Sequence, residues 1–318
     1  MFPFGDKELK IGILGFTEGN GHPYSWSAMF NGYDPEEMTT CGFPVIPQYL
    51  AKQPTHTFGI PGAKITCVCC TGFATREEAE HIARAAKIPT VYDRPEEMIG
   101  NVDAVIVATD IGNEHVERCR PFIEAGIPMF IDKPLVNKEE DLQTFCRWRQ
   151  AGAKFISSSS LRYTKELEPY YENHYELGKL QYICSPMAKY YETYGIHALE
   201  RVYPLLGPGF VSVRNTGTKE KTVVHIKHES GCDVHIVQGS LVGAGMMILG
   251  DKGGIVVRSG DSYYSFKKQL DVFVKWLRTG EDPFPFAETV ELMKLIIGGL
   301  RSREEGGREV FLSEISEV

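Results

Sequence analysis

The sequence predicts an α/β protein in which an N-terminal doubly wound parallel sheet is followed by an α+β domain with a mainly antiparallel, open-faced sheet. Short apolar runs alternate with amphipathic stretches in the first half, whereas the second half carries consecutive alternating stretches with short links. The 318 residues suffice for two domains of about 150 residues each. We place the division at residue 158, giving domains over residues 1–158 and 159–318.

Five apolar runs in the first half predict strands that are buried on both faces of a parallel sheet. They span residues 10–16, 64–71, 103–109, 128–132 and 154–158. Apolar positions recur at helical spacing between these runs, over residues 76–86, 114–125 and 138–151, and Thr75 is the predicted N-cap of the first helix. Repeated strand–helix–strand units are typical of right-handed crossovers in a doubly wound sheet.

The second half predicts an antiparallel sheet with one helix before its strands and two helices after them. A helix is predicted over residues 163–177, and Ser230-Gly231 predicts a tight hairpin. The predicted strands span residues 180–189, 210–214, 222–229, 232–239, 246–249 and 254–258, and two helices follow over residues 268–278 and 286–303. One face of such a sheet is left uncovered by helices and usually pairs with another subunit, so we expect a homodimer or homotetramer.

Composition and charge exclude several classes of protein. The formal net charge of −8 argues against a nucleic-acid partner, which requires a basic surface. No apolar run reaches the roughly 18 residues that a membrane span needs, and the first ten residues lack the apolar stretch of a signal peptide. We therefore expect a cytoplasmic protein without a membrane partner.

No metal site is predicted, although the chain carries two groups of potential ligands. Three of the eight cysteines, Cys67, Cys69 and Cys70, lie in one apolar run without a second pair at zinc-finger spacing, which favours a buried strand with reduced thiols. Three histidines alternate with apolar residues on neighbouring predicted strands, which favours a solvated sheet face. They are His225, His228 and His235.

The first predicted strand ends in a glycine-rich turn, GFTEGNGHP, over residues 15–23. Such a turn lets the backbone approach a pyrophosphate at the N-terminus of the next helix, for which Pro23 suits the first turn. The candidate cofactor-binding residues are Gly15, Phe16, Thr17 and Asn20. The pattern departs from G-x-G-x-x-G, because Thr17 and Asn20 occupy glycine positions, and an ordinary strand-to-helix turn is the alternative.

The end of the second strand leaves the choice between NAD and NADP open. The acidic residue that usually holds the ribose diol is missing near Thr71. Thr71, Thr75 and Arg76 could instead receive a 2′-phosphate, unless Arg76 is an ordinary solvated helix residue. The long link before this strand predicts an insertion over residues 31–58, which is either a lid over the site or a surface excursion.

The fourth predicted strand runs into Asp132-Lys133-Pro134, at the edge of the sheet where ligands bind in such folds. The motif DAVIVAT over residues 103–109, then His115, EAGIP over 124–128 and DKP over 132–134, resembles the glucose–fructose oxidoreductase and inositol dehydrogenase family. The resemblance continues in SSLRY, LGKL, YGIHAL, GDKGG and RTGE over residues 159–163, 177–180, 194–199, 250–254 and 278–281. It covers most of the chain from residue 64 onward, together with the first strand.

The resemblance implies an N-terminal Rossmann domain and roles for individual residues. It implies that the nicotinamide lies near Lys133 and that His197 is the acid/base on the reacting carbinol. Further residues would lie beside the cofactor, namely Thr109, His115 and Asp132, and others would face the substrate, namely Arg162, Thr193 and Tyr194. The family usually has an aspartate where this chain has Thr193, and the adjacent Glu192 is a possible substitute.

These features predict an NAD(P)-dependent oxidoreductase. Hydride would pass between a nicotinamide cofactor, NAD or NADP, and a secondary carbinol of a sugar, cyclitol or sugar-derived acid. Lys133 would stabilise the developing alkoxide and His197 would exchange the proton. Two alternatives stay open: an NAD-using non-redox sugar lyase or hydrolase, and a non-catalytic regulator that binds a dinucleotide or a sugar.

Overall fold

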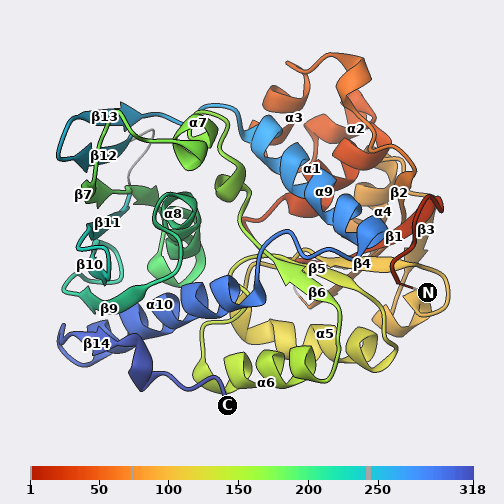
Figure 1. Ribbon diagram of the computed structural model, residues 1–318. Coiled ribbons are helices and arrows are strands. Elements are labelled where there is room, and N and C mark those ends of the chain that lie inside the picture. Colours follow the sequence, from red (N-terminus) through yellow and green to blue (C-terminus); the bar gives the residue numbers. More distant parts are fainter. Residues whose placement is uncertain (1, 73–74, 241–244) are drawn as a thin grey trace. The chain divides into compact units, whose positions relative to one another are not determined.

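The computed structural model describes residues 2–72, 75–240 and 245–318, which form two compact units (Figure 1). The units are interleaved in the sequence. The first comprises residues 1–132, 147–157 and 266–283, and the second comprises residues 133–146, 158–265 and 284–318, within the described ranges. The chain passes from one unit to the other several times, and residue 158 is one of these points. The predicted boundary between two domains stays a prediction.

The first unit is built on a six-stranded parallel sheet with the order β3-β2-β1-β4-β5-β6. Its strands are β1 (Leu9–Phe16), β2 (Ala63–Gly72), β3 (Thr90–Tyr92), β4 (Ala104–Val107), β5 (Met129–Ile131) and β6 (Phe155–Ser157). The five predicted strands are confirmed; β3 was missed because its three residues are half-buried and carry no run. The chain returns to the middle of the sheet after β3, so the carboxyl ends of β1 and β4 meet at the switch point where ligands bind.

Helices cover both faces of this sheet. They are α1 (His22–Asn31), α4 (Arg76–Ala85), α5 (His115–Glu124) and α9 (Ser262–Thr279), with short 3₁₀ turns η2 (Pro95–Met98) and η3 (Gly112–Glu114). Helix α6 (Glu139–Gln150) is shared between the two units. Thr75 caps α4 as predicted, accepting a hydrogen bond from the Glu78 N–H. Figure 1 shows α1 and α9 on one face, where Trp26 of α1 contacts Phe266 of α9, and α5 on the other.

The predicted insertion folds against the glycine loop and α4. It contains α2 (Pro35–Thr39), α3 (Val45–Leu50) and η1 (Thr55–Thr57). Thr40 bonds His81 of α4 at 2.9 Å, and the ring of Phe43 lies 5.9 Å from that of Phe16. A methyl group at Gly21 would come within 2.4 Å of Ile46 Cδ1. The segment is therefore a packed part of the first unit, and its contacts hold the outer side of the loop.

This contact gives a prediction about the insertion. Gly21→Ala should destabilise the protein by about 1–3 kcal/mol, because the added methyl overpacks the space that Ile46 and Phe43 fill. Ile46→Val removes the nearest atom at a cost of about 0.5–1.5 kcal/mol. Urea unfolding of both single variants and the double variant should show that the double costs less than the sum. If the two losses in the free energy of unfolding simply add, Ile46 of α3 is not in contact with the loop at Gly21.

The second unit is built on an eight-stranded mixed sheet with the order β13-β12-β7-β11-β10-β9-β14, in which β8 also pairs with β11. Its strands are β7 (Leu180–Cys184), β8 (Met187–Ala188), β9 (Phe210–Asn215), β10 (Thr222–His228), β11 (Asp233–Gly239), β12 (Met246–Gly250), β13 (Gly254–Val257) and β14 (Val310–Phe311). The predicted hairpin joins β10 and β11. Figure 1 shows α8 (Tyr191–Leu206) and α10 (Phe286–Glu304) beside this sheet. In β10, Val224 and Ile226 are buried while Val223 and Lys227 are exposed, as one covered and one open face require.

The helix predicted over residues 163–177 is wrong. This stretch forms η4 (Ser160–Tyr163) and the short α7 (Glu168–Glu172) instead. The Thr164 hydroxyl donates to the Leu161 carbonyl and Asn173 accepts from the Tyr175 N–H, so local side-chain bonds interrupt the helix at both ends.

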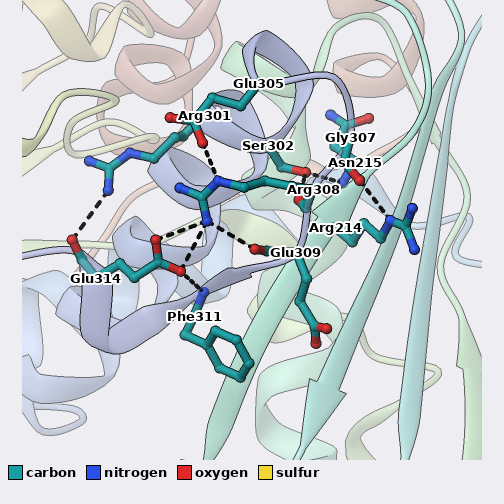
Figure 2. A network of polar contacts seen from close by, with 10 residues as sticks. All are labelled: Arg214, Asn215, Arg301, Ser302, Glu305, Gly307, Arg308, Glu309, Phe311 and Glu314. Atoms are coloured by element: carbon teal, nitrogen blue, oxygen red, sulfur yellow. Dashed lines mark hydrogen bonds and ion pairs between the residues drawn. The ribbon is translucent and has the colours of Figure 1, made fainter.

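A polar network closes the C-terminal edge of the second sheet (Figure 2). The Ser302 hydroxyl at the end of α10 accepts from the Asn215 N–H at 2.8 Å, and Arg214 donates to the Gly307 carbonyl at 2.6 Å. Arg308 pairs with Glu314 of η5 (Leu312–Glu314) at 2.9 Å. These bonds hold the two-residue strand β14 against β9.

The cysteine and histidine groups have ordinary surroundings. Cys67, Cys69 and Cys70 are buried thiols in β2, as predicted, and burial raises the pKa of each to about 12. His225 and His235 stack across β10 and β11 with ring centroids 4.9 Å apart. His228 is a correction to the predicted solvated face: it is buried, and its Nε2 lies 3.1 Å from the Pro208 carbonyl.

Within residues 2–72, 75–240 and 245–318, no helix is long and apolar enough to span a membrane.

Candidate functional site

Two side chains tie the glycine loop to the carboxyl ends of β4 and β5. Asn20 Nδ2 donates to the Ala108 carbonyl at 3.3 Å and to Asp132 Oδ2 at 3.2 Å. His22 Nδ1 lies 2.6 Å from the same carboxylate oxygen. The structure therefore brings the predicted residues Asn20 and Asp132 together. His22 was missed, because its position after the loop gives no signal until Asp132 is placed beside it.

The loop and the segment after β4 also carry polar groups that no described residue satisfies. Gly15 has φ +87°, and a Cβ there would lie 2.6 Å from Thr109 Cγ2, so only glycine fits. The buried hydroxyls of Thr17 and Thr109 have no hydrogen-bond partner among the described residues. Such groups are costly unless a ligand satisfies them. They fit a polar cofactor at the ends of β1 and β4.

The remaining predicted residues of the loop and of β4 support its shape. His115 is buried, with Nε2 2.8 Å from the Thr109 carbonyl, and so fixes the backbone that follows β4. Phe16 is buried, and its ring contacts the rings of Tyr24 and Phe43. The side chain of Phe16 therefore packs inside the unit. Only the backbone of Phe16 is left to contact a cofactor.

A different arginine from the predicted one lies at the end of β2. Arg118 of α5 donates to Thr71 Oγ1 at 2.7 Å and pairs with Glu114 at 2.7 Å, and its side chain is only 13% exposed. Arg76 is 53% exposed and pairs with Glu80 and Asp93. The hydroxyl of Thr71 is thus engaged by Arg118, whereas Arg76 is a solvated helix residue. No spacing in the sequence pointed to Arg118.

In the second unit, the aromatic ring of Tyr194 contacts both predicted catalytic side chains. Lys133 Nζ lies 5.0 Å from the centre of this ring, and the His197 ring lies 4.8 Å from it at an interplanar angle of 70°. Lys133 is 2% exposed and His197 is 8% exposed. Residues that are 64 positions apart in the sequence therefore share one buried environment, with a cation on the face of an aromatic ring.

His197 is anchored by Ser159, which belongs to the SSLRY motif. Ser159 Oγ lies 2.5 Å from His197 Nδ1, and the Ser159 N–H donates to Glu200 Oε1 at 3.1 Å. Glu200 lies on α8 with His197, so one helix supplies both partners of Ser159. The sequence motif pointed to Arg162, and the role of Ser159 was missed.

Arg162 is the buried counterion of two carboxylates. It donates to Glu200 Oε2 at 2.9 Å and pairs with Glu288, and its guanidinium lies 4.1 Å from the centre of the Phe284 ring. Burial lowers the pKa of Arg162, but the two carboxylates outweigh burial, so its pKa is raised overall. The arginine therefore stays charged and holds Glu200, which in turn holds the Ser159 backbone.

The structure does not offer Glu192 as a replacement for the family's aspartate. Glu192 pairs with Arg303 of α10 at 2.8 Å. Burial opposes ionisation, but the bonds from Arg303 lower the pKa of Glu192 overall. This carboxylate is thus committed to joining α8 and α10, and the alternative raised from the sequence is wrong. Thr193 is half-buried in the first turn of α8.

Comparisons with known proteins give a family match for part of the chain and a shared fold for nearly all of it. Residues 44–156 match the sequence model of the "Oxidoreductase family, NAD-binding Rossmann fold". Over these residues the match bears out the resemblance to the glucose–fructose oxidoreductase and inositol dehydrogenase family, and it supports an NAD-dependent dehydrogenase or reductase as the enzyme class. The glycine loop lies before the matched residues. No curated protein matches the sequence.

Solved structures share the whole fold at low identity. A probable dehydrogenase from Thermotoga maritima has a TM-score of 0.75 and 17% identity, covering 97% of this chain and 100% of its own. The myo-inositol 2-dehydrogenase from Lactobacillus plantarum has a TM-score of 0.73 and 15% identity, with 96% and 99% covered. An oxidoreductase from Agrobacterium radiobacter, solved with NAD⁺, L-tartaric acid and magnesium, has a TM-score of 0.73 and 12% identity, with 98% and 100% covered. The shared fold confirms the predicted fold class.

Proposed function

We propose that this protein transfers hydride between a nicotinamide cofactor and a secondary carbinol of a sugar, cyclitol or sugar-derived acid. The observation that carries the proposal is the buried pair of Lys133 and His197 on the ring of Tyr194. Similar folds in a myo-inositol 2-dehydrogenase and in an oxidoreductase solved with L-tartaric acid support a polyhydroxylated substrate.

The chemistry assigns different tasks to these side chains. The bound cofactor would supply the acceptor or donor of hydride. Lys133 would stabilise negative charge on the substrate oxygen, because a buried ammonium acts strongly where water is excluded. His197 would contact the same oxygen, and Tyr194 would hold both groups in place. We propose Thr193 and Arg162 as neighbours of the substrate, with Arg162 acting through Glu200.

We propose that the dinucleotide binds at the carboxyl ends of β1, β4 and β5. The backbone of Gly15 and Phe16 would approach the pyrophosphate, and Asn20 and Asp132 would fix the loop. The proposed set also includes Thr17, Thr71, Thr109 and His115. Arg118 is better placed than Arg76 for contact with the adenosine end, because it already bonds Thr71. Titration of NADH and NADPH fluorescence would decide between the two cofactors.

The unsatisfied hydroxyls give a prediction with two readouts. Thr17→Val and Thr109→Val should each weaken NADH binding about 3- to 10-fold, the loss of one hydrogen bond, while the melting temperature stays equal or rises. Ser27→Ala is the matched control, since it removes another buried hydroxyl without a described partner. It should leave the NADH Kd unchanged. Unchanged NADH binding in both threonine variants would remove these residues from the cofactor site.

The activity itself is tested by a screen of cyclitols, aldoses and sugar acids with NAD⁺ and NADP⁺. Growth of absorbance at the reduced nicotinamide band, dependent on one of these carbinols, is the expected result. Turnover without any absorbance change would favour the non-redox lyase or hydrolase. Tight dinucleotide binding without turnover of any carbinol would favour the regulator.

We further propose that the open face of the second sheet forms a homo-oligomer contact. Large apolar side chains are exposed on six of its strands. They are Tyr182, Val211, Val223, Met247, Val256 and Phe311. Sedimentation as a monomer would contradict this proposal. The cytoplasmic location expected from the sequence stays a prediction.

A further inference from the structure

The hydroxyl of Ser159 is placed between a donor and the ring of His197. The Leu161 N–H donates to Ser159 Oγ at 3.0 Å, and His197 Nδ1 lies 2.5 Å from the same oxygen. Ser159 is fully buried, with 0% exposure. A hydroxyl has one proton to donate and two lone pairs to accept with. The Leu161 N–H donates to one lone pair of Ser159 Oγ, so the proton of the Ser159 hydroxyl still needs an acceptor.

His197 Nδ1 is the acceptor that the described part of the chain offers to this proton. A ring nitrogen can accept only through its free lone pair, so the proton of a neutral imidazole must then be on Nε2. In the opposite arrangement, two N–H groups would point at Ser159 Oγ and its own proton would be buried without an acceptor. That loss makes the opposite tautomer, and the doubly protonated ring, unfavourable.

We propose that Ser159 is a positioning residue that holds neutral His197 as its Nε2–H tautomer, so that His197 donates a hydrogen bond to the substrate oxygen while Lys133 exchanges the proton. This inference rests on the proposed function. In oxidation, the carbinol C–H bond breaks with its electron pair going to the cofactor as hydride, and the hydroxyl proton passes to the Lys133 amine. In reduction, the Lys133 ammonium returns that proton, and the Nε2–H bond of His197 stays intact throughout.

The surroundings of Ser159 fix its position for this task. Glu200 Oε1 accepts from the Ser159 N–H, and the Arg162 guanidinium holds the other oxygen of Glu200. Ser159 is also the N-cap of η4 through its bond from Leu161. Three bonds to the backbone and hydroxyl thus leave the serine little freedom to turn its proton elsewhere. A neutral imidazole that donates through Nε2 polarises a carbonyl without exchanging its proton.

The first test is the tautomer of His197 in the wild-type protein without substrate. Long-range ¹H–¹⁵N correlation spectra of protein labelled at its nine histidines separate the two tautomers, and comparison with His197→Gln assigns the signal. We expect Nε2 to be the protonated nitrogen near neutral pH. Protonation at Nδ1 would overturn the proposal, whatever the enzyme's activity.

Variants of the serine separate positioning from simple packing. Ser159→Ala should leave a mixture of tautomers and lower kcat about 10- to 100-fold, as for other residues that orient a histidine. Ser159→Thr keeps the hydroxyl and should restore the single tautomer. Ser185→Ala is the matched control, because Ser185 is buried and bonds the carbonyl of Ala198 on the same helix. A tautomer unchanged by Ser159→Ala would overturn the proposal, and the wild-type spectrum decides if that variant does not fold.

Kinetics of two histidine variants test the division of labour. Glutamine can present an N–H near the position of Nε2 but cannot exchange a proton. His197→Gln should therefore retain kcat within about tenfold of wild type, whereas His197→Ala should lose about 100-fold or more. Equal losses of kcat in both variants would mean that His197 exchanges the substrate proton, which would overturn the role proposed for Lys133. A failed substrate screen together with an Nε2–H signal would instead contradict the proposed function and leave the tautomer established.

Discussion

Lys133→Ala is expected to lower kcat/KM about 10²- to 10³-fold on whichever carbinol the screen identifies. The substitution removes a side chain that is 2% exposed, lies on the ring of Tyr194 and would carry the substrate proton as an ammonium group. A preorganised charge in a site that excludes water gives its largest stabilisation as the substrate oxygen becomes negative. Steady-state rates at saturating and limiting substrate measure the loss. If the loss is in kcat, Lys133 acts in the transition state rather than in ground-state binding.

Lys189→Ala is the control for this experiment. Lys189 also lies on the ring of Tyr194, with Nζ 4.2 Å from its centre and 2.7 Å from its hydroxyl, but it is exposed. Screening by water should make its charge unimportant for the reaction, so kcat should change less than about threefold. Equal losses from both lysines would mean that the order of the Tyr194 ring, and not the buried ammonium, controls the rate.

Arg162→Met is expected to lower the free energy of unfolding by about 3–5 kcal/mol, because it breaks a buried ion-pair network by removing one partner. The buried carboxylate of Glu200 and the partly buried carboxylate of Glu288 are left without their common counterion. Urea unfolding at neutral pH measures this cost. The double variant Arg162→Met/Glu200→Gln should recover part of it, because one of the unpaired charges is then removed.

The pH dependence of this variant carries a definite sign. Burial already raises the pKa of Glu200 beside Arg162, and without this counterion its pKa must rise further, because burial favours the neutral acid. The folded state of the variant then binds more protons than its unfolded state. The variant should therefore gain stability relative to wild type as the pH falls toward the pKa of an ordinary glutamate. Arg76→Met, in an exposed ion pair, should leave stability and its pH dependence as in wild type. A loss independent of pH would point to lost packing on Phe284 instead.

The elements that the sequence predicted well are those that depend on burial. The strands of the first unit are continuous apolar runs because both of their faces are covered, as in β4, where all four residues are buried. The three residues of β3 carry no such pattern. The failed helix over residues 163–177 has helical spacing, but its Thr164 and Asn173 bond their own backbone. The Asp34-Pro35 start of α2 is a readable helix signal inside the insertion that the prediction left out.

The candidate site was predictable where it follows strand ends and not where it depends on contacts between distant segments. Asp132 and Thr109 end strands at the switch point, so the fold class alone places them near the glycine loop. His22, Arg118 and Ser159 acquire meaning only from partners that lie 110, 47 and 38 positions away. Nothing in a single sequence reports such pairings.

The short strand β14 has a consequence for the solution behaviour of the protein. It pairs Val310 with Val213 and Phe311 with Ser212, and so occupies the peptide groups of β9 at that border of the sheet. Removing residues 308–318 would bare those groups beside apolar side chains, which is the arrangement that recruits foreign strands and nucleates aggregates. We therefore expect residues 308–318 to limit aggregation at this edge of the sheet, independently of any catalysis.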